Sequence, residues 1–587
     1  MKKRESRTLR TRVVWCAAGL AATALVSPLA AQVPAKADLV VRNGPIYTMA
    51  DEQSRVEAFA VRDGRYVFRG SNTEVMAYVG PDTQILDLHG TQMAMPGIND
   101  VHMHPLDGAY EDLYACNMAP NLPLPAVLAR VADCVQRAEP GDWIVGAAWG
   151  SGLIPEVSTA DALAALDKVS GAHPVVLRDD SFHNRWVNSE VMRRVGITAE
   201  SISPPGSEIV KDAASGAPSG LLKEFPAFLA VMKQIPPRTP ERQTQAAIAA
   251  GKTLNAFGIT GAQDAFDSEA ILKIWHQVDR EHGLPFHMVA SLSAMPPEHP
   301  GDRTGIDLVD VRDQYRSANV RPAFAKLFLD GVPPARTAKF LAPYLPDHQH
   351  GNNYSGEAKY TLEQLTDLLT ALDKRGVPVK MHATGDGSVR LALDAIEAVR
   401  KRNGPDGPQH QIAHASFIAP DDIPRFAQLD VVADISPMLW FPSGIHMAIA
   451  SVIGKARADL FFPVKSLVQA GALVAGGSDW PAGQPTANPW IGIEGLVTRK
   501  DPMGIFPGAL WAKQAVDLPT ALRIYTRNSA EAMGLGQETG SIEVGKSADF
   551  IVLDQDILQL PVEQIHTVMP QRTFFKGKQV HARPEGS

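Results

Sequence analysis

The hydrophobic and polar positions of the chain predict three regions: a β-rich start, a long middle and a β-rich end. In both end regions apolar and polar residues alternate with a period of two, which is typical of short strands with one buried face. The alternating runs are 39–44, 56–61, 66–70, 84–88, 548–554 and 572–580. Asp63-Gly64 and Lys576-Gly577 have the composition of hairpin turns. Because an independent hairpin at either end would have too little core, we expect residues 38–91 and 540–587 to complete one small β-sandwich domain.

In the middle region short apolar runs alternate with helical segments, which favours a parallel α/β architecture. Eight runs read as barrel strands: 92–95, 259–264, 287–292, 323–329, 377–382, 411–414, 431–435 and 473–477. Helical segments such as 361–375 and 387–401 lie between most of them. An open doubly wound sheet would be expected to have a glycine-rich phosphate loop after its first strand, and none is present. The pattern therefore predicts a (β/α)₈ barrel over residues 92–539.

One interval between the predicted barrel strands is too long for a loop. Residues 110–238 contain strand-like runs of their own at 143–148 and 174–178, together with turns rich in proline and glycine. We interpret this stretch as a subdomain inserted over the mouth of the barrel.

The first thirty-one residues differ in character from the rest of the chain. Lysines and arginines precede an apolar run over 13–26, and small residues follow it up to Ala30-Ala31. This order is typical of a secretory signal peptide, and the run is short for a transmembrane helix. We therefore predict that residues 1–31 are removed on export and that the protein is secreted or periplasmic. An uncleaved N-terminal anchor is the alternative.

The composition narrows the class of protein and of partner. A chain of 587 residues with 45% hydrophobic and 20% charged residues is typical of a soluble globular protein with more than one domain. Its net charge of −8 comes without a basic stripe, which argues against nucleic acid or an anionic membrane surface as a partner and leaves a small-molecule substrate. After removal of the leader only Cys116 and Cys134 remain. They form either one disulfide or two small buried hydrophobic side chains.

Two histidines directly follow the first predicted barrel strand. On an extended chain the side chains at i and i+2 project to one face, so His102 and His104 can present two imidazoles to one cation. Such pairs also occur in ordinary loops and at strand edges. The position of this pair favours a metal site, because the catalytic residues of a (β/α)₈ barrel lie at the C-terminal ends of its strands.

Four more polar residues lie in or at the ends of predicted strands. They are Lys326, His382, His414 and Asp479. Each alone is compatible with a hydrogen-bonded core residue, a helix cap or, for the lysine, a packed stem. Together with the two histidines they would come from strands one, four, five, six and eight and meet at one face of the barrel. Four imidazoles and a carboxylate cannot form a dry core without unsatisfied groups, so the set predicts a metal centre.

The six candidate ligands, in this order along the chain, and the motifs around them resemble the amidohydrolase superfamily, and within it the YtcJ-like branch of the amidohydrolase 3 group. The motifs that carry the resemblance are Met95-Pro96-Gly97 with the two histidines, Lys326 with Asp330-Gly331, His382-Ala383-Thr384-Gly385-Asp386, the strand that ends at His414, Gly477-Ser478-Asp479-Trp480-Pro481, and residues 180–189, 258–264 and 540–549. The likeness extends from about residue 38 to the end of the chain. It implies a barrel with a β-sandwich, and hydrolysis with one or two divalent metal ions.

The resemblance also implies a role for each ligand. His102, His104 and Asp479 would hold one ion, and His382 and His414 the second. Lys326 matches the position of a carboxylated lysine that bridges the ions, and burial favours the neutral amine that captures CO₂. An unmodified Lys326 would favour a mononuclear centre. These ligands suit Zn²⁺, and their type is also compatible with Mn²⁺, Co²⁺ or Fe²⁺.

The implied reaction is cleavage of a non-peptide amide of a small molecule, such as an N-acyl or N-formyl amine. Divalent ions lower the pKa of water enough to supply hydroxide near neutral pH, and they polarise the carbonyl group. Asp479 would take the proton and deliver it to the departing amine. Two alternatives stay open: an ester, lactone or phosphotriester hydrolase with the same site, and a catalytically inactive periplasmic binding protein.

Six further residues are candidates for supporting roles. Asp386 either orients His382 or caps the following helix. Five residues either line the mouth for an aromatic or acyl substrate or simply pack. They are Trp149, His183, Arg185, Trp440 and Trp480.

Overall fold

The computed structural model describes residues 35–51, 54–295, 301–347, 350–439, 441–483 and 485–584. Residues from Lys36 onward form one compact unit. The predicted signal peptide and Trp440 lie outside the described residues. Within the described ranges, no helix combines the length and the apolar character needed to cross a membrane.

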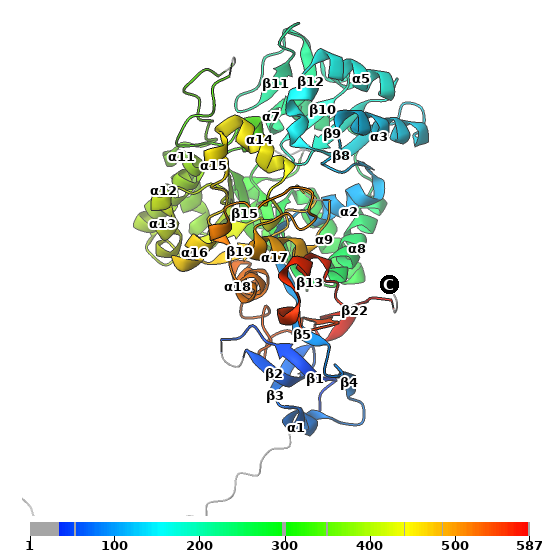
Figure 1. Ribbon diagram of the computed structural model, residues 1–587, viewed down its shortest axis with the longest axis vertical. Coiled ribbons are helices and arrows are strands. Elements are labelled where there is room, and N and C mark those ends of the chain that lie inside the picture. Colours follow the sequence, from blue (N-terminus) through cyan, green and yellow to red (C-terminus); the bar gives the residue numbers. More distant parts are fainter. Residues whose placement is uncertain are drawn as a thin grey trace, which may run out of the picture. The chain divides into compact units, whose positions relative to one another are not determined.

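The centre of the molecule is an eight-stranded parallel sheet that is nearly closed into a barrel (Figure 1). Its strands, in spatial order, are β6 (Ile98–Met103), β13 (Ile259–Asp267), β14 (His287–Ser293), β15 (Val320–Phe328), β16 (Val379–Ala383), β17 (Gln411–His414), β18 (Val432–Ile435) and β19 (Val474–Gly476). Sequential strands pair in parallel throughout. The ends of β19 and β6 approach each other, since the amide of Asp479 donates to the carbonyl of His102 at 2.7 Å. The predicted barrel is confirmed.

The first barrel strand differs from the prediction. Residues 93–96 form β5 (Met93–Pro96), which pairs with the terminal strand β20 (Phe550–Leu553) and not with the barrel. The barrel strand β6 begins at Ile98, so His102 lies inside it and His104 just beyond it. Gly97 makes the crossing feasible, because a Cβ there would lie 2.1 Å from the hydroxyl oxygen of Thr260. The residues on the two sides of Gly97 thus belong to two different sheets.

Helices follow most barrel strands and cover the sheet. The predicted helices at 361–375 and 387–401 are α11 (Leu362–Asp373) and α12 (Asp386–Asn403). In α11 the side chain of Thr361 accepts from the amide of Gln364, whose own side chain accepts from the amide of Thr361, so a capping box begins the helix. The other helices along the barrel are α2 (Pro105–Tyr114), α8 (Pro240–Ala256), α9 (Glu269–His282), α10 (Gly305–Val311), α13 (Ile423–Gln428), α14 (Gly444–Ile453), α15 (Lys455–Ala458), α16 (Val464–Gln469), α17 (Pro489–Thr498), α18 (Leu518–Arg523) and α19 (Ser529–Ala532).

Both ends of the chain contribute to a second sheet of eight strands. Its strands besides β5 and β20 are β1 (Leu39–Tyr47), β2 (Arg55–Arg62), β3 (Arg65–Gly70), β4 (Gln84–Asp87), β21 (Arg572–Phe575) and β22 (Lys578–Ala582). Phe59 on β2 contacts Phe550 on β20 with ring centroids 5.0 Å apart, although two strands separate them in the sheet. Strands in a flat sheet are about 4.8 Å apart, so this contact requires the sheet to curl over a shared core.

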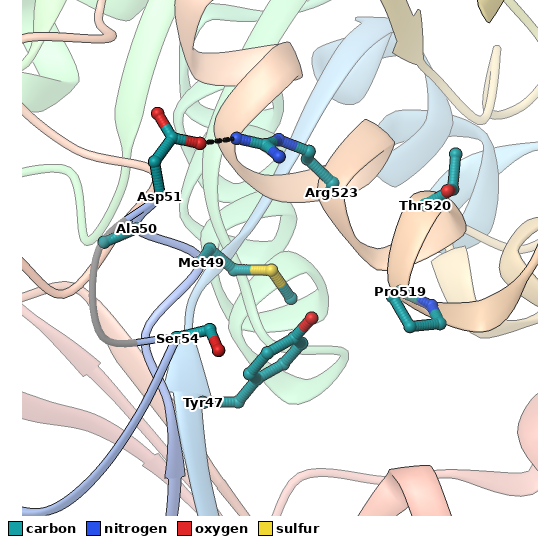
Figure 2. Close-up of a pocket in the computed structure, with 8 residues that line it drawn as sticks. All are labelled: Tyr47, Met49, Ala50, Asp51, Ser54, Pro519, Thr520 and Arg523. Carbon is teal, nitrogen blue, oxygen red and sulfur yellow. Dashed lines mark hydrogen bonds and ion pairs between the residues drawn. The ribbon is translucent and has the colours of Figure 1, made fainter.

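A cavity of about 250 Å³ lies where this terminal sheet meets the barrel helix α18 (Figure 2). Its lining includes Tyr47 and Met49 from the N-terminal part and Pro519 and Thr520 from α18. Asp51 pairs there with Arg523, which ties the two parts together. None of the described residues that line this cavity is a predicted metal ligand.

The long interval after α2 folds around a third sheet. Its strands, in spatial order, are β11 (Glu208–Lys211), β12 (Pro218–Lys223), β10 (Asn184–Val187), β9 (Val175–Asp179), β8 (Ile144–Trp149) and β7 (Cys116–Asn117). The helices α3 (Leu124–Arg137), α5 (Ala160–Ser170), α6 (Ser189–Val195) and α7 (Phe225–Met232) pack on it. The sheet has apolar clusters separate from that of the barrel. Below, this part is called the insertion.

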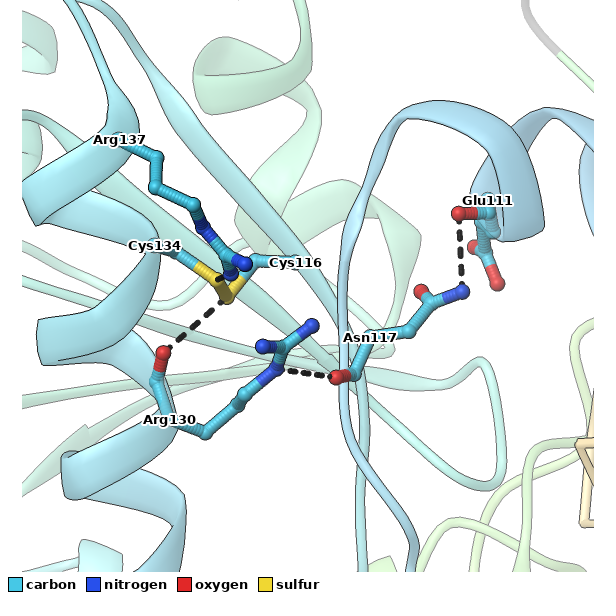
Figure 3. The surroundings of a disulfide bond; sticks show 6 residues. All are labelled: Glu111, Cys116, Asn117, Arg130, Cys134 and Arg137. Carbon is cyan, nitrogen blue, oxygen red and sulfur yellow. Dashed lines mark hydrogen bonds between the residues drawn. A yellow bond between two sulfur atoms is a disulfide. The ribbon is translucent and has the colours of Figure 1, made fainter.

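Cys116 and Cys134 form a disulfide in the insertion, which resolves the alternative that the sequence left open. The bond joins β7 to α3, and Figure 3 shows the neighbouring contacts. Arg130 of α3 donates to the carbonyl of Asn117 at 2.8 Å, and the side chain of Asn117 donates to the carbonyl of Glu111 in α2 at 2.8 Å. The disulfide thus anchors the point at which the chain leaves α2, the helix that begins directly after His104.

Candidate metal centre

Two imidazoles and one carboxylate meet where β6 and β19 end. Asp479 Oδ1 lies 3.6 Å from His102 Nε2 and 3.6 Å from His104 Nε2. Gly477 allows the approach, because a Cβ there would lie 2.6 Å from the backbone nitrogen of His102. Backbone hydrogen bonds then fix the register: the amide of His104 donates to the carbonyl of Trp480 at 2.7 Å.

The separations between these three side chains fit a bound cation. Their ligand atoms all lie within 4.8 Å of one another. A tetrahedral ion with bonds of about 2.0–2.1 Å places its ligand atoms about 3.3–3.4 Å apart. The observed 3.6 Å is close to that spacing and longer than a hydrogen bond. Nitrogen and oxygen donors arranged in this way suit a divalent metal ion.

Lys326 reaches the same point from β15. Its Nζ lies 3.5 Å from His102 Nε2, and the side chain is buried. Burial and the neighbouring Lys380 ammonium lower the pKa of Lys326 to about 7. A substantial fraction of this amine is therefore neutral near pH 7.

His382 and His414 complete the cluster from β16 and β17. Their ring centroids are 4.7 Å apart, and the ring of His414 lies 4.6 Å from that of His102. His414 Nδ1 also lies 3.8 Å from Asp479 Oδ2. The structure thus brings together all six predicted ligands: His102, His104, Lys326, His382, His414 and Asp479.

Carboxylates from other segments of the barrel hold two of the imidazoles. Asp434 Oδ2 lies 2.8 Å from His102 Nδ1, which leaves Nε2 directed at the cluster. Asp330 Oδ1 lies 3.2 Å from His382 Nδ1. Asp330 belongs to one of the sequence motifs, although we gave it no role from the sequence. Asp434 lies inside a buried strand, and no flanking motif distinguishes it in the sequence.

Asp386 does not orient His382, contrary to one of our alternatives. It is the first residue of α12, and its side chain accepts from the amide of Leu341 at 2.7 Å. The N-cap residue of α12 is Gly385, so Asp386 is not the cap either. The acidic partner of His382 is instead Asp330, at the end of the preceding barrel strand.

Asp330→Asn is expected to lower the metal affinity of the His382 position by about 10–100-fold, as replacement of hydrogen-bonded partners of ligands commonly does. Asp386→Asn is the matched control, because its amide oxygen can still accept from Leu341 and it does not touch His382. Metal titration of the two purified variants measures the difference. Equal affinities in both would remove Asp330 from the centre.

Three of the candidate substrate residues are buried and contact other groups of the protein. Trp149 lies in the core of the insertion, where its ring nitrogen donates to the carbonyl of Leu177 at 3.0 Å. Arg185 donates to the carbonyl of Asn184 and packs over the ring of Phe228. Trp480 is buried against α2, where a Cβ on Gly108 would lie 2.6 Å from its ring. These contacts agree with the second of the two alternatives that the sequence left open, in which the side chains simply pack.

His183 lies at the cluster, together with a neighbour that the sequence did not indicate. The loop between β9 and β10 places the ring of His183 5.0 Å from that of His382. The same loop stacks Phe182 on His104 at 5.5 Å. Phe328 of β15 packs on His382 at 5.2 Å, so aromatic rings surround the ligands on the side of the insertion.

Comparisons with known proteins show the family and the fold of the chain. The sequence model of the amidohydrolase family matches residues 84–581. The chain is 28% identical to the N-substituted formamide deformylase of Arthrobacter pascens, over 92% of this chain and 97% of that protein. It is 28% identical to YtcJ of Bacillus subtilis (strain 168), over 92% of this chain and 98% of that protein. An uncharacterized metal-dependent hydrolase from Pyrococcus furiosus has a similar fold, with a TM-score of 0.64 and 22% identity over 89% of this chain and all of that one.

Proposed function

The chain belongs to the amidohydrolase family, and from this premise we infer that it is a metal-dependent hydrolase of an N-substituted formamide or a related N-acyl amine. Membership makes it an enzyme that acts on a non-peptide C–N bond. The observation that carries the proposal is the convergence of the six predicted ligands at the C-terminal ends of five barrel strands. The similarity to a formamide deformylase along nearly the whole chain supports the choice of acyl group.

The residues divide between two cation positions. His102, His104 and Asp479 would hold one divalent ion, and His382 and His414 the other. When bound, such ions would supply Lewis acidity that lowers the pKa of water and polarises the scissile carbonyl. Zn²⁺ suits imidazole and carboxylate ligands.

Asp479 acts as the proton shuttle in this proposal. Burial alone would raise the pKa of its carboxyl, but the nearby imidazoles of His104 and His414 lower it. The carboxylate is therefore ready to take a proton from the attacking water. The C–N bond breaks with its electron pair on nitrogen, and Asp479 hands the same proton to that nitrogen.

Lys326 is proposed to be carboxylated. The neutral amine attacks CO₂, a C–N bond forms and one proton leaves, so the product is a carbamate with two oxygen donors. Its place beside His102 Nε2, on a strand between those of the two groups of histidines, supports a bridging position. A carbamate is chemically a carboxylate, which explains a lysine among metal ligands.

We also propose that the mature protein works outside the cytoplasm. The charged, apolar and small-residue segments of residues 1–31 support export. The disulfide between Cys116 and Cys134 supports an oxidising compartment.

The substrate class is tested by a screen of the Zn²⁺-loaded protein. N-benzylformamide, N-benzylacetamide, phenyl acetate and a simple lactone are compared by release of amine, acid or phenol, and His382→Ala serves as the inactive reference. We expect the formamide to give the highest kcat/KM. Turnover of the ester and the lactone without any amide hydrolysis would replace this proposal by an esterase or lactonase. No turnover by fully loaded protein would favour a binding function.

A further inference from the structure

The insertion directs one side chain at the metal cluster. The loop that carries His183 is fixed by Asp179, whose carboxylate accepts from the backbone amide of Asn184 at 3.0 Å and from its side chain at 2.6 Å. The backbone also ties the loop to the end of β12, since the amide of Glu224 donates to the carbonyl of His183 at 2.7 Å. The ring of His183 is therefore held beside His382 by the insertion and not by the barrel.

A buried glutamate holds this ring. Both carboxylate oxygens of Glu224 lie close to His183 Nδ1, at 3.1 and 3.2 Å. The same carboxylate accepts from Thr337 at 2.7 Å and pairs with Lys359 at 3.1 Å. Burial would raise the pKa of Glu224, but the charge of Lys359 and the hydrogen bonds from His183 and Thr337 keep it well below its usual range. An ionised carboxylate accepts a hydrogen bond, so Nδ1 of His183 carries a proton.

The backbone of Glu224 is strained, and the barrel leaves space for its side chain. Glu224 has φ +66° and ψ 151°, a region that residues other than glycine rarely occupy. In the barrel, Gly331 makes room for it, because a Cβ there would lie 2.0 Å from Glu224 Oε1. Strain of this kind is typical of functional sites, where the surrounding structure holds it in place.

The other ring nitrogen of His183 hydrogen-bonds to no residue that the structure describes, and the side chain is 11% exposed. With its proton on Nδ1, a neutral imidazole has a lone pair on Nε2. Nε2 is then a hydrogen-bond acceptor beside the metal cluster.

We propose that His183 is a further catalytic residue that determines specificity: its Nε2 accepts the N–H of a secondary amide substrate, and Glu224 is its positioning residue. This rests on the proposed function and explains how a site that could attack any carbonyl selects secondary amides. Esters, lactones and tertiary amides have no such hydrogen and lose the contact. A site built around a hydrogen bond discriminates strongly against analogues that lack the donor.

A pair of hydroxamates tests the contact without turnover. Acetohydroxamic acid and N-methylacetohydroxamic acid present the same oxygens to metal ions, but only the first has an N–H. Calorimetric titration of the Zn²⁺-loaded protein is expected to show about tenfold tighter binding of the N–H compound. His183→Ala and His183→Leu, which lack an acceptor, should abolish the preference, and the binding of the N-methyl compound that remains shows that the site is folded. Glu224→Gln should reduce the preference, because a neutral amide can donate to Nδ1 and place the ring proton on Nε2.

His173→Ala is the matched control, since this histidine of the insertion hydrogen-bonds through Nδ1 to the carbonyl of Asp142. Equal affinities of the wild type for the two hydroxamates, or binding of neither, would overturn the proposal whatever the enzyme hydrolyses. So would a parallel loss of bound zinc in the His183 variants, which would make His183 a metal ligand. Failure of the proposed function gives a different result: no amide is hydrolysed, while the hydroxamate preference is read independently.

Discussion

Lys326→Ala is expected to lower kcat/KM for the formamide by at least about a thousandfold, or about 4 kcal/mol of transition-state stabilisation. The variant removes the side chain that lies 3.5 Å from His102 Nε2, between the two groups of ligands, and so removes the proposed bridge. Bound metal should fall from two ions towards one per chain. Elemental analysis of the purified variant and steady-state kinetics measure the two effects.

Lys326→Met separates the loss of a ligand from the loss of packing. Methionine fills much of the same space without an amine, whereas alanine leaves a cavity in a buried site. A short carboxylate such as acetate, added to the alanine variant, can occupy that cavity and supply the missing oxygens. We expect acetate to restore part of the metal and of the activity to the alanine variant only. Full metal content in both variants would show that Lys326 is not a ligand.

The ligands could be predicted from the sequence because each lies in or at the end of a buried apolar run. In β16 the sequence shows Val379 and Met381 alternating with Lys380 and His382, and all five residues of this strand are buried in the structure. Parallel strands in a barrel end at one face, so the topology places the side chains together without knowledge of their contacts. The bounds of the first barrel strand were predicted wrongly, because the apolar residues on the two sides of Gly97 belong to two different sheets.

The partners of the ligands could not be predicted, since they come from contacts between elements. Asp434 reaches His102 from a strand that is 332 residues away in sequence, and Glu224 reaches His183 across 41 residues. Neither has a flanking pattern that distinguishes it from other buried acids. For Trp149 the sequence left lining the mouth and packing as alternatives, and the insertion buries this residue in its own core.

Asp479→Asn is expected to slow hydrolysis of the formamide by about 10⁴-fold and hydrolysis of an activated phenyl ester by about 10²-fold. An alkylamine cannot leave as an anion, so breakdown of its tetrahedral species depends on the proton that Asp479 delivers. A phenolate of low pKa leaves without a proton. Steady-state kinetics with p-nitrophenyl acetate and N-benzylformamide on metal-loaded protein give both values.

The ratio of the two rate losses distinguishes the two roles that Asp479 has in the proposal. As a ligand it lies 3.6 Å from both His102 Nε2 and His104 Nε2, and weakened metal binding would slow both substrates equally. As the acid that protonates the departing nitrogen it affects only the substrate with the poor leaving group. A loss that is equal for ester and amide would leave Asp479 as a ligand and assign the proton transfer to another group. A selective loss with full metal content would establish the carboxylate as the acid that releases the amine.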